Sequence, residues 1–211
     1  EPDLHGYEMK KCSQSKITLG DFSASENLFS KQGKRSLINT LNGFTNDDLF
    51  TRADFIRTFG AQNPLKNNRY SWSGKCVPTY DVWNSSGQTL AIVENDIHVM
   101  YSYDKDTRDK KVVFPDFLKN NDVCIAIWTE EKLKRCIERK FNNNGFFICK
   151  KNGNVFTHIC FGKPFTYSHF LDNIRSKAII FDSGMYMGNS RNYSMFRGKP
   201  DFWQNLITEE F

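Results

Sequence analysis

The sequence contains no long apolar run and no closely spaced cysteine pair. No stretch reaches the roughly 20 apolar residues that a membrane-spanning helix needs, so we expect no membrane partner. Its 6 cysteines are scattered without a C-x-x-C pair, and several stand in apolar runs, which argues against a disulfide framework and a zinc site. No signal peptide precedes the first motif. We therefore expect a soluble, cytoplasmic protein with reduced thiols.

Several catalytic arrangements are missing as well. The sequence holds no Ser/His/Asp arrangement and no Gly-rich phosphate loop, which removes triad hydrolases and P-loop nucleotide enzymes from consideration. His98, His158 and His169 lack the spacing of metal ligands, so we interpret them as structural.

The composition that remains is that of a folded, mildly basic protein. The 211 residues include 39% hydrophobic residues and 19 Phe, enough for one domain with a sizeable core. The 29 basic and 24 acidic residues give a net charge of +5. This balance favours a polyanionic partner, because Lys and Arg near phosphates release condensed counterions. Ordinary surface charge is the alternative.

Alternating and helical patterns divide the chain into short elements. The predicted strands are residues 4–10, 17–22, 88–103 (two runs around 94–96), 122–128, 146–150, 155–161 and 177–182. The predicted helices are residues 46–59, a segment beginning at Thr129, 166–175 and 200–211, and the predicted loops are 61–87 and 183–199. Strands and helices that alternate in this way indicate an α/β (α+β) core around a mixed sheet.

The cluster Pro2-Asp3-x4-Glu8-x-Lys10 carries the clearest chemistry. On a strand, Glu8 and Lys10 point to the same side, roughly 7 Å apart, and Asp3 can lean towards them. Two carboxylates and the backbone carbonyl of Met9 are oxygen ligands of the kind that Mg²⁺ prefers. The metal would activate a water and neutralise charge on a phosphate, and Lys10 would orient or deprotonate that water. The plain alternative is a surface Asp followed by an edge-strand Glu–Lys pair.

Three other charged segments have structural alternatives. Residues 66–75 mix basic residues, Arg69 among them, with two aromatic residues, and either contact DNA or form a polar loop pinned to the core. Residues 104–111 alternate in charge and are interpreted as a solvated turn. The charged residues of the helix that begins at Thr129, Lys140 included, are interpreted as an exposed, salt-bridged face.

The run PDLHGYEMK at residues 2–10 resembles the PD-(D/E)xK nuclease motif in the form found in the MvaI and BcnI restriction endonucleases, relatives of the mismatch-repair nickase MutH. The similarity continues along most of the chain. The matching segments are Lys16–Leu19, Ile56–Gly60, Trp128–Leu133 followed by residues 146–150, and residues 177–184 followed by Ser194–Arg197. The resemblance implies a restriction-endonuclease-like core with a central mixed β-sheet flanked by helices, plus a DNA-recognition lobe.

The resemblance also implies roles at the motif. Asp3 and Glu8 would be metal ligands, together with the Met9 carbonyl, and Lys10 the catalytic lysine. The implied metal is Mg²⁺, with Mn²⁺ as an expected substitute. His5 matches a histidine in part of the family, and it either lies near the site or only forms a turn.

Five basic residues are candidate DNA contacts. Lys16 would approach a phosphate. Arg197 and Arg191 would enter the major groove and donate to guanine O6 and N7, the commonest specific contact of arginine; a solvated basic loop is the alternative. Arg57, in one of the matching segments, and Arg69 complete the set. The loop of family members that is rich in histidine is replaced here by Ser190–Tyr193, which leaves the base specificity open.

The expected domain is one PD-(D/E)xK endonuclease domain over residues 1–211. Residues 1–60 and 88–128 would supply catalytic core elements, and residues 61–87 and 183–199 would be DNA-contacting loops. Family members have a helix before the motif that this sequence lacks. We therefore expect residues 1–211 to be the C-terminal part of a longer protein, or to need a second chain.

The expected function is Mg²⁺-dependent, sequence-specific cleavage of double-stranded DNA in the bacterial cytoplasm. A monomer would nick one strand at a time, with a further DNA-recognition domain fused or bound to it. Two alternatives remain open. One is a DNA-binding module or subunit of nuclease fold that does not cut alone, and the other is a repair-type nicking endonuclease or a metal-dependent RNase.

Overall fold

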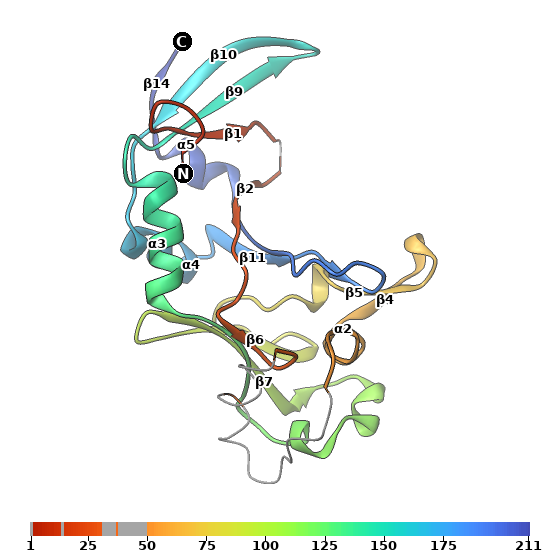
Figure 1. The fold of residues 1–211 in the computed structure, drawn as a ribbon. Helices are drawn as coiled ribbons and strands as arrows, with labels where there is room; N and C mark the ends of the chain where they lie inside the picture. Colours follow the sequence, from red (N-terminus) through yellow and green to blue (C-terminus); the bar gives the residue numbers. More distant parts are fainter. Residues whose placement is uncertain (1, 14, 31–36, 38–49) are drawn as a thin grey trace. The chain divides into compact units, whose positions relative to one another are not determined.

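The computed structural model describes residues 2–13, 15–30, 37 and 50–211 (Figure 1). Its contacts group the chain into two compact units. Unit 1 consists of Glu1–Phe22, Glu130–Ile180 and Met195–Phe211, and unit 2 of Ser23–Thr129 and Phe181–Ser194. Each unit therefore combines segments that are distant in the sequence.

Unit 1 is built on a mixed four-stranded sheet. Its strands lie in the order β1 (Glu8–Lys11), β9 (Phe146–Asn152), β10 (Val155–Gly162) and β14 (Ile207–Glu210). Strand β1 runs parallel to β9, and the other pairs are antiparallel. Strand β1 thus forms one edge of this sheet among the described strands.

Two further groups of elements complete unit 1. Strand β2 (Ile17–Asp21) pairs antiparallel with β13 (Ser194–Gly198), in a sheet of order β11-β13-β2 whose third strand is β11 (Ile179–Ser183). Residues 181–183 of β11 and Ser194 of β13 are grouped with unit 2. The helices are α3 (Glu130–Phe141), α4 (Tyr167–Arg175) and α5 (Pro200–Gln204).

An aromatic cluster forms the core of unit 1. Phe141, at the end of α3, stacks on Phe165 with ring centroids 4.7 Å apart. Phe146 of β9 meets Trp203 of α5 edge-on at 4.8 Å. The indole N–H of Trp203 donates to the Gly198 carbonyl at 3.2 Å, so this buried ring leaves no unmatched donor. The cluster holds α3 and α5 in fixed positions with respect to β9.

Unit 2 contains an antiparallel four-stranded sheet. The strand order is β3 (Glu26–Asn27), β8 (Val123–Trp128), β7 (Asp96–Asp106) and β6 (Ser86–Val93). Strands β6 and β7 form the predicted hairpin, and its two turn residues, Glu94 and Asn95, have φ angles of 51° and 81°. Such left-handed pairs suit the right-handed twist of the strands that they connect.

A smaller three-stranded sheet of unit 2 packs against helix α2 (Arg52–Phe59). Its order is β12 (Met185–Tyr186), β5 (Arg69–Trp72) and β4 (Ala61–Asn63). Phe55 of α2 is buried and lies edge-on to Trp72 at 5.0 Å. The 3₁₀ helices of this unit are Pro64–Lys66, Gly74–Cys76, Asp109–Val113 and Asp116–Leu118.

The predicted mixed α/β class is confirmed, and the strands predicted between residues 88 and 182 are present. Residues 61–87, predicted as a long loop, contain the β4–β5 hairpin. The predicted helix over 46–59 begins at Arg52 in the described part, and residues 46–49 lie outside the described residues. No helix among the described residues is long and apolar enough to cross a lipid bilayer.

Four predicted elements are wrong in part. Residues 104–111, predicted as a solvated turn, begin with the end of β7 and include Asp106, which is buried and pairs with Arg108 at 2.6 Å. Residues 4–7 form a tight turn instead of a strand, closed by reciprocal Leu4–Tyr7 backbone bonds of 3.1 and 2.8 Å with His5 at φ 46°. The loop predicted over residues 183–199 contains the strands β12 and β13. The helix predicted over residues 200–211 stops at Gln204, because the segment that includes β-branched Ile207 and Thr208 adds to the edge of β10 as β14.

We expect Phe146→Ala to lower the free energy of unfolding by about 3–5 kcal/mol, because it removes a fully buried ring and leaves a cavity beside Trp203. Phe156→Ala is the matched control, since Phe156 lies on the same hairpin but is 61% exposed. Urea denaturation measures both variants. Equal losses of stability in the two variants would contradict this description of the core.

Candidate active site

The predicted cluster is centred on two charged side chains that share the inner face of β1. Glu8 is 3% exposed and Lys10 8% exposed, whereas Met9 between them is 54% exposed. The period-two alternation predicted from the sequence is therefore present. Its inner face carries charge instead of apolar side chains, and buried charges are costly unless they are paired.

The carboxylate of Glu8 receives two ammonium groups on one oxygen. Lys10 Nζ donates to Glu8 Oε1 at 2.7 Å, and Lys140 Nζ donates to the same atom at 2.6 Å. Lys10 also donates to the Leu19 carbonyl at 2.9 Å, which fixes its ammonium between β1 and β2. The second oxygen, Glu8 Oε2, is buried and has no hydrogen-bond partner within the part of the chain that the structure describes.

A glycine turn places β1 beside the end of α3. The chain leaves α3 and enters β9 through Gly145, at φ 86°, where an added Cβ would lie 2.2 Å from the Gly162 carbonyl oxygen. Only glycine fits this approach. The Glu8 N–H donates to the Gly145 carbonyl at 3.0 Å, so the same turn sets the start of the β1–β9 ladder. Lys140, close to the end of α3, thereby reaches the Glu8 side chain.

Asp3 occupies the open edge of β1. In a parallel ladder only alternate residues bond to a given neighbour, and here Glu8 bonds to the β9 side. The backbone N–H and C=O groups of Met9 therefore point away from β9, to the other edge of β1. There the Met9 N–H donates to Asp3 Oδ2 at 2.9 Å. Because the N–H and C=O of one strand residue point the same way, the Met9 carbonyl lies on the edge that Asp3 occupies.

The surroundings of Lys10 favour its neutral form more than water does. Burial is the main cause, and it lowers the pKa of the Lys10 ammonium. The Glu8 carboxylate opposes this effect, and the nearby Lys140 charge adds to it. The net direction is a lowered pKa, which makes proton exchange at Lys10 Nζ easier near neutral pH.

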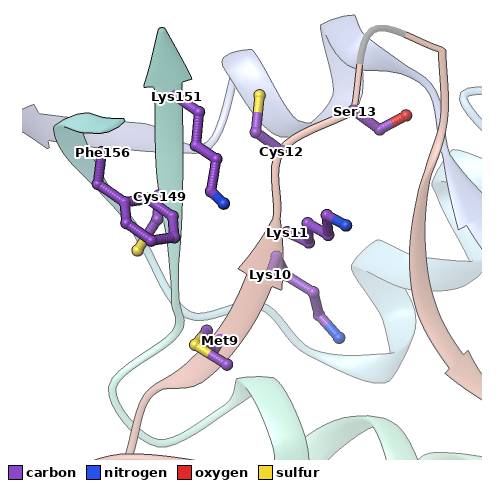
Figure 2. A pocket seen from close by; sticks show the side chains of 8 residues that line it. All are labelled: Met9, Lys10, Lys11, Cys12, Ser13, Cys149, Lys151 and Phe156. Atoms are coloured by element: carbon purple, nitrogen blue, oxygen red, sulfur yellow. The ribbon is translucent and has the colours of Figure 1, made fainter. Parts of the chain in front are cut away.

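A cavity of about 520 Å³ adjoins this cluster. Lys10, Lys11, Lys16 and Lys140 line it, together with residues of β2. A second cavity of about 470 Å³ is lined by residues of β1 and the β9–β10 hairpin; Figure 2 shows Lys10 extending away from Lys151 and Phe156 of that hairpin. Four lysines around the first cavity form an electropositive space of the kind that attracts phosphate groups.

Two of the predicted DNA contacts lie in unit 1 with this cluster. Lys16 is exposed just before β2 and lines the same cavity as Lys10, so the structure brings these two together. Arg197 lies on β13, in a strand where the sequence predicted a loop, and its Nη2 is 3.5 Å from Met195 Sδ.

The other three predicted contacts belong to unit 2. Arg57 is exposed on α2. Arg69 of β5 stacks on the Tyr186 ring at 3.6 Å, and Arg191 lies over the Tyr193 ring at 4.7 Å. The structure describes these arginines within unit 2 and the Glu8 cluster within unit 1.

Lys140 is the site residue that the sequence interpretation missed. The prediction of an exposed, salt-bridged face holds for Lys134, which lies 3.9 Å from Glu130 on the same helix. It is wrong for Lys140, which pairs with Glu8. The available signal was its position three residues after Ile137 and next to Phe141, at the border of the buried stripe of α3.

The donors at the cluster fit a hard divalent cation. No group of three or more His, Cys, Asp or Glu side chains is gathered as a metal site within the described residues. The candidate ligands for a cation are oxygen atoms: Glu8 Oε2, an oxygen of the Asp3 carboxylate and the Met9 carbonyl oxygen. Mg²⁺ is commonly held by one or two carboxylates plus waters and substrate oxygens, so this small donor set fits it.

Comparisons with known proteins agree with the motif. The family model described as LlaMI restriction endonuclease matches residues 1–211. The chain is 37% identical over 221 residues to the type II restriction enzyme ScrFI of Lactococcus lactis subsp. cremoris, covering 98% of this chain and 80% of that relative. The structure of the restriction endonuclease MvaI in complex with cognate DNA matches with a TM-score of 0.55 at 13% identity, covering 100% of this chain and 79% of that one.

The last likeness shows the fold alone, and it confirms the restriction-endonuclease-like architecture predicted from the sequence. The family match and the curated relative confirm the predicted resemblance to type II restriction enzymes, which are site-specific deoxyribonucleases. The chain belongs to the LlaMI restriction endonuclease family.

Proposed function

We propose that this chain cuts double-stranded DNA at a specific sequence and uses Mg²⁺ to do so. Family membership supports the reaction class, and the Glu8 cluster carries the assignment of the site. A carboxylate that is 3% exposed, with one oxygen held by two lysines and the other without a partner among the described residues, is costly for a purely structural role. The cost is understandable if a cation and a phosphate complete the arrangement.

The proposed metal ligands are Asp3, Glu8 and the Met9 carbonyl. Mg²⁺ is the expected metal and Mn²⁺ the expected substitute, because both accept oxygen ligands. When bound, the cation supplies Lewis-acid stabilisation of the charge that builds up on the scissile phosphate. Asp3 would keep its hydrogen bond to the Met9 N–H through Oδ2, and this bond fixes the carboxylate beside the carbonyl.

Lys10 is the proposed catalytic lysine. Its Nζ is held by Glu8 and by the Leu19 carbonyl, so it stays in one place while the substrate changes. Its lowered pKa favours the amine form relative to a lysine in water, and in that form Nζ would take a proton from the attacking water. In the ammonium form it stabilises the phosphate charge instead. Both roles require the buried position that β1 gives it.

The proposed partner is double-stranded DNA, bound by a monomer that cuts one strand at a time. Lys16 and the lysines of the 520 Å³ cavity would bind phosphates near the cut. Residues 61–87 and 183–199 would contact the DNA elsewhere, with Arg191 and Arg197 reading guanine and Arg57 and Arg69 binding nearby. In this proposal, residues 1–211 form one endonuclease domain, and a further DNA-recognition domain is fused or bound to it.

A cytoplasmic location in a bacterium belongs to the same proposal. The cysteines Cys12, Cys76, Cys124, Cys136, Cys149 and Cys160 are all free thiols in the structure, which suits a reducing compartment. The curated relative comes from a bacterium, Lactococcus lactis subsp. cremoris.

We expect Lys10→Ala to slow cleavage of a plasmid of known sequence by about 100- to 10,000-fold, because it removes the group that exchanges the proton. The measurement is single-turnover cleavage in Mg²⁺, with DNA binding followed separately in Ca²⁺ by fluorescence anisotropy. Binding should stay within about threefold of wild type, since phosphate contacts by other lysines remain.

Lys134→Ala is the control for this variant, because Lys134 is half-exposed on α3 and lies 3.9 Å from Glu130 of the same helix. Discrete fragments from the wild-type chain support a restriction-type enzyme, and nicked circles alone support a nickase. Binding without any cleavage supports the module that does not cut alone. Full activity in Lys10→Ala would sink the assignment of the site.

We expect Lys140→Met to raise the affinity of the DNA-free protein for Mn²⁺ by about tenfold, because the Lys140 ammonium on Glu8 Oε1 repels a cation at the other oxygen of the same carboxylate. Calorimetric titration of Mn²⁺ measures this affinity directly. Lys134→Met on the same helix is the matched control and should leave it unchanged. Weaker Mn²⁺ binding in Lys140→Met would show that Lys140 supports the metal site instead of repelling the cation.

A further inference from the structure

Arg52 holds both ends of the loop that connects β12 with β13. Its Nη1 donates to the Tyr186 carbonyl at 3.2 Å, where the loop begins. At the other end, Nη2 donates to the Arg191 carbonyl at 2.7 Å and Nε to Asn192 Oδ1 at 2.6 Å. One guanidinium group therefore closes a loop of a few residues, and all these residues lie in unit 2.

The position of Arg52 in the fold is electrostatically unfavourable. Its hydrogen bonds to the loop are therefore the reason that we give for an arginine at this position. Arg52 is the first residue of α2, where the helix dipole repels a positive charge. Burial adds to the cost and lowers the pKa of its guanidinium. Its three acceptors among the described residues are neutral oxygens, so these contacts hold it by hydrogen-bond geometry. Arginine suits this task because its donors form a rigid fork.

The helix that carries Arg52 is itself fixed. A capping box joins Thr51 and Asp54 at its first turn. Phe55 and Phe59 are 1% and 0% exposed, and Phe55 packs on Trp72 of β5 at 5.0 Å. Arg52 therefore attaches the loop to the packed α2–β5 core of unit 2.

Further hydrogen bonds hold the loop between the two ends that Arg52 contacts. The Asn189 side chain donates to the Tyr186 hydroxyl at 3.0 Å and accepts the Arg191 N–H at 2.7 Å. The Met187 N–H donates to the Tyr70 carbonyl at 3.0 Å, which continues the β5–β12 pairing into the loop. These bonds leave the Arg191 backbone held on both its N–H and its carbonyl.

The fixed backbone carries arginines that are already oriented. Arg191 lies over the Tyr193 ring at 4.7 Å, and Arg69 stacks on Tyr186 at 3.6 Å. Stacked guanidinium planes have fewer rotamers to lose when they meet a flat, polar surface such as a base edge. A loop that moved would lose this advantage, because base reading needs donors in a defined place.

We propose that Arg52 is a positioning residue for sequence recognition: by closing the Tyr186–Asn192 loop, it presents Arg191 to the bases in one orientation and so sets the preference for the cognate site. The inference rests on the proposed function, in which this loop contacts DNA. Arg52 itself need not touch the DNA. It acts on discrimination between sites and leaves the Glu8 cluster of unit 1 unchanged.

The test compares Arg52→Gln and Arg52→Lys with wild type on a plasmid whose cleavage sites have been mapped with the wild-type chain. We expect Arg52→Gln to lower the ratio of cleavage at mapped sites to cleavage elsewhere by about tenfold, through a raised KM with kcat within about threefold of wild type. Arg52→Lys keeps the charge but cannot span three acceptors, so its ratio should also fall.

Hydrogen exchange supplies an independent readout. The amide protons of Met187 and Arg191 should exchange on the order of tenfold faster in Arg52→Gln, because their closure is lost. Those of β9 should be unchanged, which excludes general unfolding. Arg175→Gln is the matched control, since Arg175 pairs with Asp172 on the surface of α4.

Three outcomes overturn the inference. A wild-type ratio in Arg52→Gln would show that the loop does not need the clamp. A wild-type ratio in Arg52→Lys would show that charge alone suffices. If the wild-type chain does not cleave DNA at all, both the proposed function and this inference are wrong. If the wild-type chain gives discrete fragments and the variants give the same ratio as wild type, the inference alone is wrong.

Discussion

The candidate site of unit 1 is organised around one buried carboxylate. Glu8 receives two ammonium groups on Oε1, at 2.7 and 2.6 Å, and keeps Oε2 buried without a hydrogen bond in the described part of the chain. Removing such charges from water costs several kcal/mol per ion, so the arrangement exists only where the geometry is maintained by the fold. Strand β1 supplies Glu8 and Lys10, β2 supplies the Leu19 carbonyl, and α3 supplies Lys140. The β1–β9 pairing and the aromatic core around Trp203 hold these elements in place.

In the proposed function, the lysines of unit 1 contact phosphates and the arginines of unit 2, together with Arg197 of unit 1, contact bases. Unit 1 gathers lysines, whose compact charge suits contact with phosphate oxygens and with a carboxylate. Unit 2 presents arginines stacked on tyrosines, and the planar fork of arginine suits base edges. This division follows the chemistry that a site-specific nuclease needs, since cleavage acts on the backbone while recognition acts on the bases. The inferred role of Arg52 belongs to the second task.

Local patterns predicted the elements of the site better than its contacts. The alternation around Glu8 and Lys10 and the left-handed turn at Glu94–Asn95 depend on neighbours in sequence, and both were predictable. Lys140 and Arg52 were not, because each meets its partners across more than 130 residues of chain. The C-terminal helix was predicted too long for a related reason. Residues 207–210 pair with β10, and a pattern of neighbouring residues does not reveal such a distant strand partner.

Anomalous scattering from crystals soaked in Mn²⁺ tests the central claim most directly. The account predicts one peak in contact with Glu8 Oε2, the Asp3 carboxylate and the Met9 carbonyl. It also predicts that Lys10 keeps its bond to the Leu19 carbonyl. A Mn²⁺ ion bound elsewhere, with Glu8 still held by both lysines, would contradict the account and leave the buried carboxylate as a structural ion pair.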